Sequence, residues 1–142
     1  AQYQLHHHTA VASPSLAWYL VRDCDPAGLG VMLDPGNQCH EGHEVLPRSV
    51  ALLGAHLGAW GIKDARWWRD DDHAHMPDKG WRLEWCRLEH GIVNWHAIGE
   101  LCRRIDFRGT MVFMPFYHQD DAAALTEALA ADVAYLRAAL RA

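Results

Sequence analysis

Leu-Asp-Pro-Gly-Asn at residues 33–37 and Ile-Lys-Asp at residues 62–64 are the two stretches that decide the expected fold. Each follows a short apolar run of the kind found in parallel strands covered on both faces. Asp34 and Lys63 therefore stand at the carboxyl ends of two predicted strands. An acid and a cation at the carboxyl ends of successive strands are how an α/β barrel builds a polar active site. The two stretches thus indicate an enzyme scaffold of the α/β class.

Predicted strands and helices alternate along the chain. The strands are expected at Gln2–His7, Gly30–Leu33, Ala59–Ile62 and Met111–Phe116, and the helices at Leu16–Cys24, Pro47–Leu57, Asn94–Ile105 and Ala122–Leu140. This β-α order, repeated four times, predicts a (β/α)4 domain with parallel strands and right-handed crossovers. Asp34-Pro35-Gly36 is expected to form a turn. Residues 65–88 are too long for a connector and are expected to be an insertion or lid within the single domain, residues 1–142.

The length predicts half of a barrel. A complete eight-stranded α/β barrel needs about 250 residues, and this chain has 142. An open half exposes apolar strand edges, which favour association. We therefore expect the other half to come from another protein chain, from a second copy in a homo-oligomer, or from a further segment.

Composition excludes several classes of protein. The formal net charge is −5 and the basic residues are scattered, which argues against a nucleic-acid surface. No apolar run approaches the roughly 20 residues that a membrane helix needs, and we expect no signal peptide, because no basic segment followed by an apolar stretch is present at the start. The four cysteines form no CxxC pair, which favours free thiols in a reducing cytoplasm. No nucleotide cofactor is expected.

An ordered set of motifs carries a family resemblance across nearly the whole chain. The motifs are His6–Thr9 with Ser13–Ser15, Gly30–Asn37, Glu41–Glu44, Ile62–Ala65, Glu89–Trp95, Phe107–Val112 and Asp132–Arg137. With them the chain resembles the C-terminal half of the xylose isomerase-like TIM barrels, a family of sugar isomerases and epimerases with the abasic-site endonucleases as distant relatives. The resemblance implies strands five to eight of the barrel and a small polyhydroxylated carbonyl compound or sugar derivative as substrate.

The resemblance also implies a metal site, and this sequence departs from it. Members of the family hold one divalent metal through Glu, Asp, His and Glu on strands five, six, seven and eight. Those positions fall here at Gln4, Asp34, Gly61 and Met114, so only the Asp is kept. A lone carboxylate holds Mg²⁺ or Mn²⁺ weakly, because hard cations need several oxygen ligands. We therefore expect a degenerate or repurposed metal site.

Asp34 and Lys63 are the expected catalytic residues if the protein is active. Asp34 would ligate the metal or act as base, and Lys63 would stabilise an enediolate oxygen. The alternatives are a turn cap for Asp34 and a buried ion-pair partner for Lys63. Asn37 is an expected substrate-binding residue, with turn stabilisation equally open.

Histidines offer a substitute for the lost ligands. His6 and His8 alternate onto the same strand face as Gln4 and could join Asp34 in a metal site for Zn²⁺, Fe²⁺ or Mn²⁺. The alternative is a pair of hydrogen-bonded histidines at the barrel mouth, with His8 and His118 binding substrate. The sequence thus predicts a sugar isomerase/epimerase-like subunit with a degenerate metal site. The alternative is a non-catalytic pseudoenzyme that supports a catalytic partner.

Overall fold

A four-stranded parallel sheet forms the centre of the computed structural model, which describes residues 1–6, 8–41, 44–117 and 121–141. The strand order is β1-β2-β3-β6, and each neighbouring pair is parallel. The strands are β1 (Gln2–Gln4), β2 (Gly30–Leu33), β3 (Leu57–Ile62) and β6 (Thr110–Phe113). Together with the helices between them they form half of an α/β barrel, as the sequence predicts.

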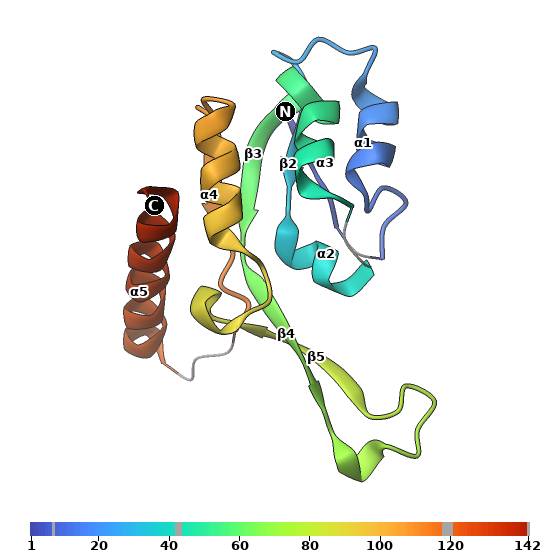
Figure 1. The fold of residues 1–142 in the computed structure, drawn as a ribbon, viewed down its shortest axis with the longest axis vertical. Helices are drawn as coiled ribbons and strands as arrows, with labels where there is room; N and C mark the ends of the chain where they lie inside the picture. The colour runs from blue at the N-terminus through green and yellow to red at the C-terminus, as the bar shows by residue number, and fades with distance from the viewer. Residues whose placement is uncertain (7, 42–43, 118–120, 142) are drawn as a thin grey trace.

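Helices cover the sheet in two packed pairs, α1 with α3 and α4 with α5 (Figure 1). The helices are α1 (Pro14–Val21), α2 (Pro35–Glu41), α3 (Leu46–Leu53), α4 (Trp95–Arg104) and α5 (Ala122–Arg141). Ser13 and Asn94 cap α1 and α4 by accepting a backbone N–H with their side chains. Among the described residues, no helix is both long and apolar enough to span a membrane.

The core lies between the sheet and these helices. Trp60 of β3 and Trp95 of α4 are completely buried and belong to one hydrophobic cluster with the aliphatic side chains of the strands and helices. The fully buried members of this cluster that come from the strands or directly follow them are Leu5, Val31, Leu33, Trp60 and Ile62. Burying such side chains stabilises the fold by about 1.5–3 kcal/mol for each. The sheet is therefore a rigid base for the residues at its carboxyl edge.

A two-stranded antiparallel hairpin leaves the carboxyl end of β3 (Figure 1). It consists of β4 (Asp64–Arg69) and β5 (Trp81–Cys86), with Ala65 opposite Trp85 in the register. Lys63 is the single residue between β3 and β4. The hairpin also contacts α2, because the indole Nε1 of Trp67 donates to the carbonyl oxygen of Cys39 at 3.1 Å. Whether this hairpin is a lid remains a prediction.

Several predicted boundaries are wrong, each for a local reason. The first strand ends at Gln4 and not at His7, because its last partner in β2 is Met32. The last strand ends at Phe113 and not at Phe116, since Pro115 lacks the N–H that a ladder needs. The predicted helix Pro47–Leu57 ends at Leu53, and β3 already begins at Leu57.

Residues 35–41 form a helix where a turn was expected. Asp34 caps it, since its Oδ1 accepts the backbone N–H of Asn37 at 3.0 Å. Pro35 occupies the first helical position, where its missing N–H costs nothing. The same pattern, a capping residue followed by proline, begins α1 at Ser13 and was the available signal.

Candidate functional site

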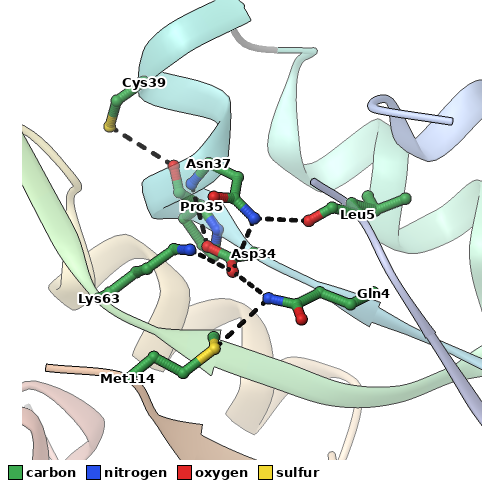
Figure 2. Close-up of polar contacts among 8 residues, drawn as sticks. All are labelled: Gln4, Leu5, Asp34, Pro35, Asn37, Cys39, Lys63 and Met114. Atoms are coloured by element: carbon green, nitrogen blue, oxygen red, sulfur yellow. Dashed lines mark hydrogen bonds and ion pairs between the residues drawn. The ribbon is translucent and has the colours of Figure 1, made fainter. Parts of the chain in front are cut away.

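The four positions that the resemblance aligns with metal ligands converge at the carboxyl edge of the sheet; Figure 2 shows three of them, Gln4, Asp34 and Met114, and Gly61 lies beside Asp34 and Met114. Gln4 ends β1, Asp34 follows β2, Gly61 lies on β3 and Met114 follows β6. Nε2 of Gln4 lies 2.9 Å from Oδ2 of Asp34 and 3.4 Å from Sδ of Met114. The geometry therefore brings together the positions that the resemblance selects, although the side chains differ.

Asp34 is completely buried, and donors from several residues surround its carboxylate, mostly at Oδ2. Oδ1 accepts the backbone N–H of Asn37, and Oδ2 accepts the side-chain amide of Asn37 at 3.0 Å. Oδ2 also accepts Nε2 of Gln4 and lies 3.2 Å from Nζ of Lys63. Asn37 is fixed in turn, because its Nδ2 donates to the carbonyl oxygen of Leu5 at 2.7 Å. Asp34, Asn37 and Lys63, three of the predicted site residues, thus form one contact network.

Lys63 is held by one ion pair and two aromatic faces. Its side chain is 2% exposed, and Nζ lies 4.7 Å from the ring centroid of Trp85 and 4.6 Å from that of Phe116. Among the described residues it has no hydrogen-bond acceptor besides the Asp34 carboxylate. Burial lowers the pKa of Lys63, and the charge of Asp34 opposes that shift. Lys63 is therefore a desolvated cation beside a desolvated anion.

The residues present do not fit a divalent metal. A Cβ atom at Gly61 would lie 2.6 Å from Cε of Met114 and 2.8 Å from Oδ2 of Asp34, so no ligating side chain fits there without a shift. The amide nitrogen of Gln4 and the ammonium of Lys63 both face the carboxylate oxygen that a metal would need. Within the described ranges, no group of three His, Cys, Asp or Glu side chains is placed to hold a metal.

The substitute histidine site is not assembled in the described part of the chain. The prediction put His6 and His8 on one strand face with Gln4, but β1 ends at Gln4 and His8 has a φ of 59°, so strand alternation stops. The exposed ring of His8 lies instead 6.3 Å from that of His40 on α2. His118, predicted to bind substrate, lies outside the described residues.

Two aromatic residues of the site were not predicted. Trp85 lies in the predicted insertion, residues 65–88, and Phe116 at the end of the predicted last strand, so neither was expected at the site. Their rings lie 5.8 Å apart, T-shaped, and together cover Lys63. Trp85 comes from the hairpin, so the pairing of β5 with β4 is what carries it over the sheet edge. The signal available in the sequence was that the predicted insertion, residues 65–88, begins almost directly after Lys63.

A second buried carboxylate lies beside the site and fixes the backbone. Oδ1 of Asp64 accepts the backbone N–H groups of Ala65, Ile92 and Val93, and Oδ2 accepts Nε1 of Trp95 at 2.8 Å. Burial raises the pKa of Asp64 to about 6, against the opposing effect of these donors. Asp64 thus ties the start of the hairpin to the loop that leads into α4.

The sequence matches the profile of the xylose isomerase-like TIM barrel family over residues 2–139. No functionally curated protein matches it. Similar solved structures include a xylose isomerase-like TIM barrel protein from Mycobacterium smegmatis in complex with magnesium, at 20% identity and a TM-score of 0.69. They also include D-psicose 3-epimerase from Clostridium cellulolyticum H10 with D-tagatose (17%, 0.68) and 3-keto-D-glucoside 4-epimerase from E. coli (17%, 0.63).

These alignments cover almost all of this chain and less than half of each similar protein. The shares are 98% of this chain and 44% of the M. smegmatis protein, 98% and 48% for the psicose epimerase, and 96% and 44% for the glucoside epimerase. At such identities the likeness establishes the fold. The chain therefore corresponds to a half-barrel of these proteins.

Proposed function

Because the chain belongs to the xylose isomerase-like TIM barrel family, we propose that it is the carboxyl-terminal half of a sugar isomerase/epimerase-like protein. Its substrate class is a small polyhydroxylated carbonyl compound or sugar derivative, and its site works without a metal at the four family positions. The observation that carries this proposal is the Asp34–Lys63 pair at the carboxyl edge of the sheet. That edge is where barrel enzymes of this architecture do their chemistry.

The pair has the two groups that proton transfer beside a carbonyl requires. The ammonium of Lys63 stabilises negative charge on a carbonyl or enediolate oxygen, which is electrostatic catalysis in a site of low dielectric constant. The carboxylate of Asp34 accepts the proton from the neighbouring carbon. Asn37 and Gln4 hold that carboxylate in place through hydrogen bonds of 3.0 and 2.9 Å. We assign Lys63 as the electrophile and Asp34 as the base.

The half-barrel needs a complement. In the described sheet β1 and β6 are the edge strands, each paired on one side only. Val112 and Phe116 are more than a third exposed at or beside the β6 edge. Another chain, a second copy or a further segment would cover these edges. The four cysteines are free, which supports a reducing compartment, and we propose the cytoplasm.

A non-catalytic role is the second candidate, and one observation favours it. Among the described residues, the Asp34 side chain is 0% exposed and the Lys63 side chain 2% exposed. A substrate reaches this pair only if a covering side chain moves. In this second reading the ion pair is structural, and the protein supports a catalytic partner.

Exchange of substrate protons with solvent separates the two functions. The protein, in the assembly in which it is purified, is incubated with ketoses and ketose derivatives in D₂O, with EDTA or with Mn²⁺, and followed by NMR. The proposal expects deuterium at the carbon next to the carbonyl, unchanged by EDTA and lost in Asp34→Asn. Exchange that needs Mn²⁺ would contradict a metal-free site. No exchange with any sugar, together with binding of a protein partner, would favour the non-catalytic role.

A further inference from the structure

The ammonium of Lys63 is a buried donor with most of its capacity unused. An ammonium carries three N–H donors, and in the described structure Lys63 meets one carboxylate oxygen and two ring faces. Leaving charged donors without oxygen partners inside a protein is costly. Aromatic faces offset only part of this cost. Such an amine is poised to react with an electrophile that reaches it.

A pocket lies directly beyond the two rings. Trp85 and Phe116 line it together with Glu84 and Tyr117, and its volume is about 380 Å³. Tyr117 is fixed, because its hydroxyl donates to Oδ2 of Asp132 at 2.8 Å. Pockets of this size hold small organic molecules. The Phe116 ring both lines this pocket and lies 4.6 Å from Nζ of Lys63, so we expect its displacement to open a route between the two.

We propose that the amine of Lys63 forms a Schiff base with the carbonyl carbon of the substrate, which enters through this pocket. The inference rests on the proposed function and deepens it, since a covalent iminium on Lys63 takes over the polarising role that the proposed function gives to the Lys63 ammonium. Lysine amines react in this way with carbonyl compounds where apolar surroundings desolvate them. Lys63 meets that condition through its burial between Trp85 and Phe116.

The steps balance within the ion pair. Asp34 takes one proton from the Lys63 ammonium, and the freed amine attacks the carbonyl carbon, forming the C–N bond. The carbonyl oxygen takes a proton from the nitrogen, which gives a carbinolamine. The C–O bond then breaks, and the oxygen leaves as water with the proton held by Asp34. One water is released, the iminium keeps the single positive charge, and Asp34 is again a carboxylate that accepts the adjacent C–H proton.

The sequence provides its own control. It contains only two lysines, Lys63 and Lys79. Lys79 is exposed in the loop between the hairpin strands. An exposed amine reacts with aldehydes and ketones without a site, so labelling of Lys79 reports non-specific chemistry. The ratio of labelling at Lys63 to labelling at Lys79 therefore measures how far the reaction at Lys63 exceeds non-specific chemistry.

Reductive trapping tests the proposal. The purified protein is incubated with dihydroxyacetone and sodium cyanoborohydride, under conditions in which Lys79 becomes labelled, and peptides are mapped by mass spectrometry. We expect a reduced adduct on Lys63 in excess over Lys79, and no adduct with glycerol, which lacks the carbonyl. Labelling of Lys79 without Lys63 would overturn the proposal.

Two variants test the route. Phe116→Ala removes a ring that covers Nζ and should speed labelling of Lys63 several-fold. Trp68→Ala is the matched control, because Trp68 is 42% exposed and faces the opposite side of the hairpin from Trp85. Equal rates in both variants would overturn the route through the pocket. Deuterium exchange without a Lys63 adduct would refute the Schiff base alone, and an adduct without exchange would refute the isomerase alone.

Discussion

Lys63→Met removes the charge of the buried pair while keeping most of the side-chain volume. Met is flexible and contacts aromatic rings favourably, so it fills the space between Trp85 and Phe116. The carboxylate of Asp34, 0% exposed, then keeps its amide donors but loses its counter-charge. Breaking a buried ion pair from one side costs about 3–5 kcal/mol. For a chain of this length that corresponds to a fall in melting temperature of roughly 10–15 °C.

Urea unfolding followed by tryptophan fluorescence measures this loss. The double variant Lys63→Met/Asp34→Asn leaves no unpaired charge. Its loss of unfolding free energy should therefore be smaller, by about 2 kcal/mol or more, than the sum of the losses in the two single variants. Arg66→Met is the matched control. It removes an exposed ion pair with Glu84 and should cost less than about 1 kcal/mol. A Lys63→Met variant as stable as Arg66→Met would refute the argument that Asp34 depends on Lys63 for charge compensation.

Three further predictions concern packing and charge near the site. Gly61→Ala places a Cβ atom 2.6 Å from Cε of Met114 and should lower the free energy of unfolding by about 1–3 kcal/mol; an unchanged urea midpoint would contradict the close packing. Asp64 should titrate near pH 6 in a carboxyl carbon NMR experiment. The carboxyl of an unfolded Asp titrates near pH 4, so between about pH 4 and pH 6 the folded state binds a proton that the unfolded state does not. The contribution of Asp64 to stability should therefore rise as pH falls from about 6 to about 4. An Asp64 titration midpoint near pH 4 in the folded protein would refute this. Asp132→Ala leaves the Tyr117 hydroxyl without its acceptor and should cost about 1–3 kcal/mol, with faster hydrogen exchange in α5; unchanged exchange would show that this contact does not fix the helix.

The parts of the fold that were predicted correctly are those with strong local signals. Gly30–Leu33 is a continuous apolar run, and the strand has those bounds. The predicted helix Asn94–Ile105 begins at Asn94, and Asn94 caps α4, because its side-chain oxygen satisfies a free backbone N–H. Such signals need no knowledge of the rest of the chain.

The parts that were wrong depend on tertiary pairing. His6 and His8 continue the alternation of the first strand, yet a strand lasts only as long as its neighbour, and pairing with β2 ends at Gln4. The covering of Lys63 by Trp85 likewise depends on the antiparallel register of β4 and β5, which places Trp85 opposite Ala65. The periodicity of the sequence predicts neither where the first strand ends nor the register of β4 and β5.

The replacements at the family's metal positions depend on one another. The absence of a side chain at Gly61 leaves the space that Met114 fills, since a Cβ atom there would meet Cε of Met114. Met114 in turn meets the amide of Gln4, whose Nε2 also donates to Asp34. Lys63 supplies the positive charge that a buried carboxylate needs in place of a metal. A single substitution that introduced a metal ligand at one of these positions would therefore meet an occupied space and a carboxylate whose charge is already compensated.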